Sequence, residues 1–200
     1  ISFLAAFVTL LLGACGGTSS AKKSEKSDNT DSAPALAEVY QYRVVGEYPH
    51  SSRSYTQGLE YVDGVMWEGT GREGRSHLQR IELATGKVDI VASLPKDEFG
   101  EGITLLGDRI YQLTWLNGKM HIYDRKSLKP IATHTYKGEG WGLTTDGAKL
   151  YMSDGTSTIR VVNPESFATD ASICVTLDGQ PLSLLNELEW VDGMIWANVY

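Results

Sequence analysis

Residues 57–69 read QGLEYVDGVMWEG, and similar phrases occupy 101–113 (EGITLLGDRIYQL), 141–153 (WGLTTDGAKLYMS) and 186–198 (NELEWVDGMIWAN). Each phrase has two short apolar-rich runs separated by a turn that contains Asp and Gly. That pattern is a strong signal for a β-hairpin. The phrases begin 40 to 45 residues apart, so the chain is built from a repeated unit of this length.

A third strand and a turn follow each of the first three hairpins, at LQRIELATGK (78–87), HIYDRKSLKP (121–130) and IRVVNPESFA (159–168). Three to four strands at this period are typical of a β-propeller blade. A meandering β-sandwich is the alternative, but sandwiches seldom repeat one phrase in register, so we expect an all-β propeller over 38–200. The fourth unit stops at Tyr200, in its second strand. Since a propeller must close, we expect a truncated chain that supplies about four blades.

The composition excludes several classes of protein. The 200 residues carry a formal net charge of −7 and include 42% hydrophobic and 10% aromatic residues, which excludes a disordered chain. Because there is no basic excess, nucleic acid is not an expected partner. Two cysteines, Cys15 and Cys174, cannot form a disulfide framework, and we expect Cys174 to be a small buried residue of a strand.

The first residues have the features of an export signal. Residues 1–12 form an apolar run that is short for a bilayer span but suits the hydrophobic region of a signal peptide. The sequence LGACG at 12–16 is similar to a bacterial lipoprotein cleavage box, in which Cys15 becomes the lipidated first residue; an ordinary secretory signal is the alternative. We expect 1–15 to be a lipoprotein signal peptide and 16–37 a flexible polar linker. The protein would then be an exported bacterial lipoprotein of the periplasm or cell envelope, in contact with a membrane through its lipid anchor only.

The residue that opens each phrase differs chemically from one unit to the next. These residues are Gln57, Glu101, Trp141 and Asn186. Equivalent positions at the entrance of the innermost strands form a ring around the channel of a propeller, where a purely structural repeat would place similar residues. Two amides, a carboxylate and an indole indicate a functional site carried by the scaffold, with a hydrogen-bonded polar plug as the alternative.

The aromatic residues near the repeats fall into two groups. Four of them recur at one repeat position and are assigned to the core: Trp67, Tyr111, Tyr151 and Trp196. Trp115 and Tyr200 follow the inner hairpins less regularly, and we expect them to wall the mouth of the channel.

The pattern offers little for a metal site. Calcium and magnesium prefer several oxygen ligands, whereas the ring has one carboxylate, Glu101, with Glu187 adjoining Asn186. The four histidines show no close pairing, so zinc is not expected. The sequence also has no GxSxG motif and no phosphate-binding loop.

Five spaced motifs stand out in this order: YTQGL at 55–59, FGEGIT at 99–104, QLTW at 112–115, GWGL at 140–143 and LNELE at 185–189, followed by WAN at 196–198. Together they closely resemble the plant and bacterial type of glutaminyl-peptide cyclotransferase (glutaminyl cyclase). The resemblance covers about residues 40–200 and implies a five-bladed β-propeller. It implies an enzyme that converts the N-terminal glutamine of a peptide or protein to pyroglutamate and releases ammonia. It implies no cofactor, unlike the zinc-dependent animal type, and we expect a monomer.

The resemblance also implies roles for individual residues. Glu101 corresponds to the family's proposed catalytic carboxylate, and Gln57 and Asn186 correspond to its active-site amides. The aromatic substrate pocket of the family corresponds to Trp115, Trp141 and Tyr200. The family commonly has Trp at the last of these positions, and its active-site lysine would lie beyond residue 200.

Two other functions remain open from the sequence. A propeller hydrolase or lactonase with a metal in its channel should be inactivated by a chelator. A non-catalytic propeller that binds a partner or glycan on its face should keep its function when Glu101 is replaced.

Overall fold

The computed structural model describes residues 39–200, and in this range the chain forms sixteen β-strands. No helix in the same range is long and apolar enough to cross a membrane. The predicted signal peptide at 1–15, the lipidation residue Cys15 and the predicted linker at 16–37 lie outside the described residues.

Most of the strands belong to three antiparallel sheets of four strands, each in chain order. The first sheet contains β1 (Thr56–Val62), β2 (Val65–Thr70), β3 (His77–Glu82) and β4 (Lys87–Ser93). The second contains β5 (Gly100–Leu106), β6 (Arg109–Thr114), β7 (Lys119–Asp124) and β8 (Pro130–Thr135). The third contains β9 (Leu143–Thr145), β10 (Leu150–Met152), β11 (Thr158–Val162) and β12 (Thr169–Cys174). Two hairpins follow, β13 (Thr176–Leu177) with β14 (Gln180–Pro181), and β15 (Leu185–Val191) with β16 (Met194–Val199).

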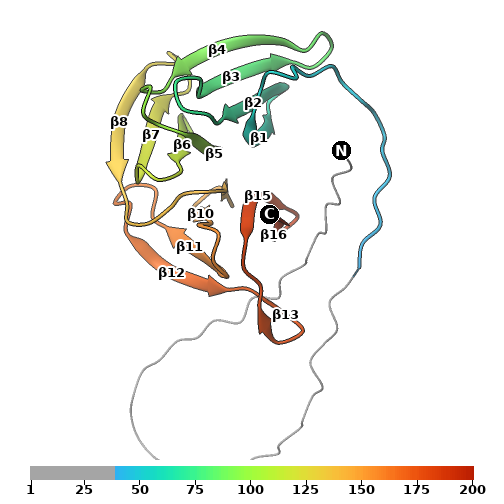
Figure 1. Ribbon diagram of the computed structural model, residues 1–200, viewed down its shortest axis with the longest axis vertical. Helices are drawn as coiled ribbons and strands as arrows, with labels where there is room; N and C mark the ends of the chain where they lie inside the picture. The colour runs from blue at the N-terminus through green and yellow to red at the C-terminus, as the bar shows by residue number, and fades with distance from the viewer. Residues whose placement is uncertain (1–38) are drawn as a thin grey trace, which may run out of the picture.

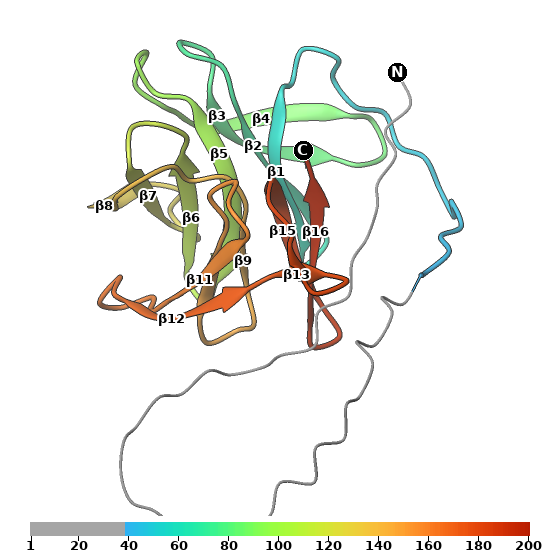
Figure 2. The ribbon, with the colours of Figure 1, turned by 60° about the horizontal axis from the view of Figure 1, so that its bottom comes forward.

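The sheets are set around a common centre like blades, with β4, β8 and β12 on the outside (Figure 1). Their first strands form the inner ring, because β1 contacts β5, β5 contacts β9, and β9 contacts β15. Figure 2 shows the inner strands β5, β9 and β15 running along the centre of the molecule. The predicted all-β propeller is confirmed. Within the described residues, three blades have four strands and a fourth unit consists of the hairpin β15–β16.

Two of the repeated hairpin turns have the backbone conformation that an Asp–Gly loop predicts. Asp63 and Gly64 have φ angles of 50° and 82°, and Asp192 and Gly193 have φ angles of 51° and 82°. Two successive positive φ angles match the twist of a two-residue hairpin loop, and Asp–Gly adopts them with little strain. These turns fix the register, since Val62 pairs with Val65.

A glycine after each of the first three ring residues lets neighbouring blades approach. A Cβ atom on Gly58 would lie 2.5 Å from the backbone nitrogen of Ile103 in the next blade. A Cβ atom on Gly102 would lie 2.6 Å from the carbonyl oxygen of Trp141, and one on Gly142 would lie 2.1 Å from that of Asn186. These distances are far inside van der Waals contact, so the inner strands meet backbone to backbone. The repeated glycine therefore lets each inner strand lie directly against the next, which brings together the residues that open the repeats.

The core lies between adjacent blades rather than inside each sheet. One cluster joins the first two blades through Trp67, Leu78 and Ile110, and a second joins the next two through Tyr111, Leu143 and Leu150. The third cluster joins the third blade to the fourth hairpin and includes Ile159, Leu185 and Leu188. Burial of these side chains stabilises the order of the blades around the centre.

Three expectations about burial are wrong or only partly right. Trp67 and Tyr111 are buried as predicted, but Tyr151 and Trp196 are only half-buried. Tyr151 stacks on Trp190 and its hydroxyl donates a hydrogen bond to Asp146, so its polar end stays at the surface. Cys174, predicted to be buried, is exposed because it ends β12, the outer edge strand of its blade.

Candidate active site

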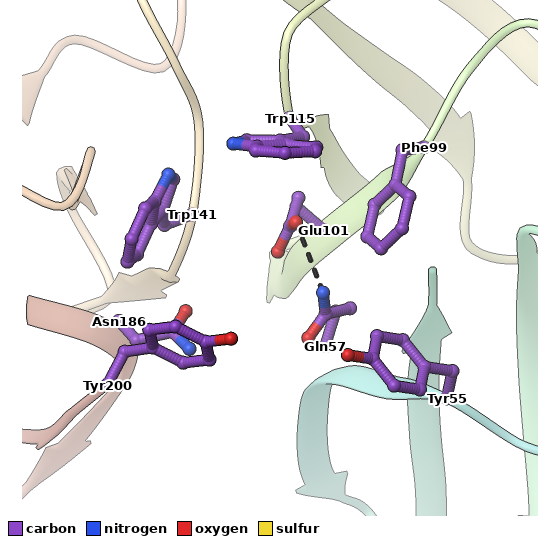
Figure 3. A pocket seen from close by; sticks show the side chains of 8 residues that line it. All are labelled: Tyr55, Gln57, Phe99, Glu101, Trp115, Trp141, Asn186 and Tyr200. Carbon is purple, nitrogen blue, oxygen red and sulfur yellow. Dashed lines mark hydrogen bonds between the residues drawn. The ribbon is translucent and has the colours of Figure 1, made fainter. Parts of the chain in front are cut away.

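One pocket collects the residues at the entrance of the inner strands. It is lined by Tyr55, Gln57, Phe99, Glu101, Trp115, Trp141, Asn186 and Tyr200 (Figure 3). The six site residues singled out in the sequence are all among these eight. They come from three blades and the fourth hairpin, so the site exists only because the blades are arranged around one centre.

Bulges in the inner strands aim the polar residues into this pocket. The ladder between β1 and β2 pairs Thr56 with Thr70 and then Gly58 with Gly69, which leaves Gln57 without a partner. The same kind of register shift passes over Glu101 in β5 and over Asn186 in β15. A bulge releases a residue from the ladder and redirects its side chain.

Glu101 is the buried acid of the site, with only 5% of the residue exposed. The Nε2 group of Gln57 donates a hydrogen bond to Oε1 of Glu101 at 3.2 Å. The pKa of Glu101 is raised to about 9, mainly by burial and next by the negative charge of Glu139, while the hydrogen bond from Gln57 opposes the shift. Glu101 therefore holds a proton at neutral pH and is placed to exchange it with a ligand.

Aromatic rings surround this acid and its amide partner, as Figure 3 shows. Phe99 makes edge-to-face contacts with Tyr55 and Trp115, at centroid distances of 6.1 and 5.7 Å. Trp141 makes an edge-to-face contact with Tyr200 at 6.0 Å. Glu101 is buried at the floor of the pocket, whereas Trp115 and Tyr200 are 37% and 80% exposed at the rim. Such a pocket suits an apolar chain with a polar end.

Two of the lining residues, Tyr55 and Phe99, were not assigned to the site from sequence, although both fall inside motifs that carry the family resemblance. Each lies two positions before a ring residue, Tyr55 before Gln57 and Phe99 before Glu101. Their shared position in the repeat is therefore the sequence signal that could have identified them. The same place in the third unit holds Glu139, which does not line the pocket but accepts hydrogen bonds from two of its aromatic residues.

Three further carboxylates lie on the inner strands β1 and β15. Burial raises the pKa of Glu60 and of Glu189 to about 7, and raises that of Glu187. Negative charge on neighbouring groups adds to the shift at Glu187, and Glu101 is one of those groups. The backbone N–H of Leu59 donates to Glu187 at 3.2 Å. In the part of the chain that the structure describes, no group of three or more His, Cys, Asp or Glu side chains could hold a metal ion.

A buried acid that accepts a hydrogen bond from one amide side chain, enclosed by aromatic rings at one end of a propeller, defines a site for a small polar group on an apolar stem. The model of the glutamine cyclotransferase family matches residues 10–200. The chain belongs to that family, which confirms the resemblance seen in its motifs.

Individual relatives agree with this assignment. The chain is 39% identical over 166 residues to a glutaminyl-peptide cyclotransferase of Arabidopsis thaliana, covering 81% of this chain and 51% of that protein. It thus spans about half the length of the curated relative that it matches. Among solved structures, the glutaminyl cyclase of Myxococcus xanthus is 34% identical with a TM-score of 0.71, covering 79% of this chain and 67% of the other. A nidogen/laminin complex matches with a TM-score of 0.57 at 18% identity, over 76% of this chain and 59% of the other, which reflects the fold alone.

Proposed function

We propose that the full-length protein cyclises the N-terminal glutamine of peptides or proteins to pyroglutamate and releases ammonia. The observation that carries this proposal is the buried acid Glu101, hydrogen-bonded to Gln57 within a ring of aromatic side chains. Family membership and the named activity of the Arabidopsis relative support the same reaction. The substrate is a chain end, which fits a pocket that is closed at the bottom and open at its rim.

The raised pKa of Glu101 determines where the proton lies when the substrate binds. A peptide α-amino group has an ordinary pKa of roughly 7.7–8.0, below the value of about 9 for Glu101. In a complex that carries one proton between these two groups, the proton therefore lies on Glu101 rather than on the α-amine. The α-amine becomes neutral and nucleophilic without leaving the site.

The reaction then needs one bond made, one bond broken and one proton carried. The amine nitrogen attacks the side-chain amide carbon of the same residue, and proximity within the glutamine supplies much of the rate. Amide N–H groups of Asn186 and Gln57 are suited to stabilise the oxyanion that forms. Glu101 donates the proton that it holds to the departing nitrogen, which leaves as ammonia, and the resulting carboxylate then accepts the proton that the attacking nitrogen loses.

The aromatic walls hold the remainder of the residue. Trp115 and Trp141 are placed to pack against the methylene groups of glutamine and to exclude water from the amide. Excluding water favours cyclisation over hydrolysis and maintains the low polarity that raises the pKa of Glu101.

The pH dependence of kcat/KM is expected to be bell-shaped with a narrow maximum between about pH 8 and pH 9. Below the pKa of the α-amine, the amine is protonated as well as Glu101, so the nitrogen cannot attack. Above the pKa of Glu101, about 9, the complex lacks the proton that the leaving nitrogen needs. Initial rates across this range on a glutamine-initiated peptide measure both limbs. A basic limb that is absent up to about pH 10.5 would contradict the role of Glu101.

We also infer that the protein is an exported lipoprotein anchored through Cys15, with residues 16–37 as the tether. The support lies in the sequence: an apolar run at 1–12, small residues directly before Cys15, and a polar segment after it. Two or more acyl chains anchor a protein stably, whereas one chain does not.

Replacement of Cys15 by Ser is expected to release the protein from the membrane fraction into a soluble pool, because the lipid attachment atom is lost. Ultracentrifugation and immunoblotting of cells that express the full-length protein measure the distribution. Replacing Ser19 by Ala, four residues further along the tether, is the matched control and should leave the protein with the membrane. If the Ser variant of Cys15 stays in the membrane fraction, the anchor lies elsewhere.

A further inference from the structure

Glu139, on the loop between β8 and β9, touches the two tryptophans of the pocket without lining it. We propose that Glu139 is a positioning residue that fixes the indole rings of Trp115 and Trp141 to each other and so sets the width of the substrate pocket. The kinetic part of this inference rests on the proposed cyclisation, whereas its structural part does not.

A single carboxylate oxygen joins the two rings. Oε2 of Glu139 accepts hydrogen bonds from Nε1 of Trp115 at 2.6 Å and from Nε1 of Trp141 at 2.8 Å. An indole has only one donor, so each ring commits its only directional bond to this oxygen. Bonds to a charged acceptor are about twice as strong as neutral ones. The two rings come from different blades, which makes Glu139 a bridge across the seam between them.

The backbone around Glu139 is itself held in place. Arg160 donates to the carbonyl oxygen of Glu139 at 3.0 Å and to that of Lys137 at 3.1 Å. The N–H of Gly140 donates to the carbonyl oxygen of Trp115 at 3.1 Å. The carboxylate thus projects from a loop that is fixed on both sides, so its position determines that of the rings rather than the reverse.

The far side of Trp141 leaves that ring little freedom. A Cβ atom on Gly155 would lie 2.7 Å from the indole, so the ring rests directly on this glycine. On its outer side Trp141 meets the edge of Tyr200. The Glu139 bond is then the contact that fixes the remaining tilt, and that tilt sets how closely Trp141 can approach a bound side chain.

The charge of Glu139 also acts on the buried acid. It raises the pKa of Glu101, after the larger effect of burial. Two other titratable groups interact electrostatically with Glu101, namely Glu187 on β15 and Tyr136 directly after β8. Neither substitution at Glu139 described below replaces these groups. The positioning bonds and the charge can therefore be separated by the choice of substitution.

The structural test is an NMR spectrum of the indole N–H groups in the full-length ¹⁵N-labelled protein, with assignments from Trp115→Phe and Trp141→Phe. In Glu139→Ala the signals of Trp115 and Trp141 are expected to move upfield together, because both lose a charged acceptor. The other indole signals should stay in place, and so should all of them in Glu165→Gln, which removes an exposed carboxylate on the β11–β12 loop. Unchanged signals of Trp115 and Trp141 in Glu139→Ala would overturn the proposal.

The kinetic test compares Glu139→Ala with Glu139→Gln on a glutamine-initiated peptide. Loss of both bonds in the Ala variant is expected to raise KM about 10-fold, with a smaller fall in kcat. The Gln variant keeps an acceptor oxygen but loses the charge. It should keep a KM within about threefold of wild type, and its basic limb should move to lower pH by roughly half a unit or more.

The two readouts separate this proposal from the proposed function. If the wild-type protein releases no ammonia from the peptide, the cyclisation proposal fails, and the indole spectrum alone still decides the role of Glu139. If the wild-type enzyme is active but KM is the same in Glu139→Ala and wild type, the carboxylate does not shape the substrate pocket. Thermal unfolding of Glu139→Gln, compared with Glu165→Gln, shows whether the variant remains folded.

Discussion

Glu101→Gln is expected to lower kcat on a glutamine-initiated peptide by about 10²–10⁴-fold, the usual contribution of acid–base catalysis. The substitution keeps the size of the side chain and most of its hydrogen-bonding capacity towards Gln57, but it removes the group that carries the proton. KM should change much less, because the aromatic walls remain. The residual rate should also lose its basic limb, since the group that titrates near pH 9 is gone.

Trp141→Ala is the comparison that separates a loss of substrate binding from a loss of proton transfer. Losing the ring should weaken binding as well as turnover, since Trp141 lines the pocket and, in the proposed reaction, packs against the substrate's stem without carrying a proton. A rise in KM for Trp141→Ala and a fall in kcat for Glu101→Gln would together separate the two roles. Wild-type kcat in Glu101→Gln would rule out the proton transfer that is assigned to Glu101.

Gly102→Ala is expected to cause a large loss of stability for a single added methyl group. Its Cβ would lie 2.6 Å from the carbonyl oxygen of Trp141 and 2.7 Å from the backbone nitrogen of Leu143, and backbone atoms cannot move aside cheaply. The N–H of Gly102 also donates to that carbonyl oxygen at 2.8 Å, a bond that the clash would stretch. The free energy of unfolding should fall by about 1–3 kcal/mol. Because Glu101 and Trp141 would separate, kcat/KM should fall by at least about 10-fold.

A second glycine substitution controls for the loss of glycine as such. Gly107→Asn changes a hairpin turn where a Cβ atom would meet no other atom within 4 Å and where the φ angle is 58°, a conformation that Asn accepts. Its melting temperature and activity should stay close to wild type. If Gly102→Ala melts at the same temperature as Gly107→Asn, the close approach between β5 and the third blade is not needed for stability.

The fold could be predicted from the sequence because each repeat contains its own turn and strand pattern. The pair Asp63–Gly64 dictates the turn by positive φ, and the alternation around it dictates two strands. The glycine after each ring residue was visible as part of the phrase, but its physical reason was not. Only the assembled blades show that Gly58, Gly102 and Gly142 make room for the next inner strand.

The candidate site could be predicted for a related reason. Where a repeated motif has chemically different residues at one equivalent position, the fold does not determine those residues, so they are candidates for function. This reasoning located Glu101 and its neighbours, but it did not assign Tyr55 and Phe99, which it treated only as parts of family motifs. It also did not detect Glu139, because the fact that matters is one oxygen shared by two indoles from different blades. No local sequence pattern predicts this contact.

Burial was predicted less well, for a physical reason. Tyr151 and Trp196 share a repeat position with Trp67 and Tyr111, but each blade packs against a different neighbour. Trp67 lies in the core between two four-stranded blades, whereas Trp196 belongs to the two-stranded sheet β15–β16. Equivalence in the repeat thus predicts the strand and the face, but the adjoining blade decides how much of the side chain is covered.

We propose that the full-length protein cyclises N-terminal glutamine with Glu101 as the proton carrier and without a metal. The direct measurement is ammonia release from a glutamine-initiated peptide, with mass spectrometry of the product and with a peptide that has glutamine in second place as the control. We predict one ammonia per peptide, a product lighter by the mass of ammonia, no reaction of the control, and the same rate after treatment with a chelator. Release of ammonia from the control peptide, or loss of activity with chelator, would contradict the account, the second result in favour of a metal-dependent propeller hydrolase.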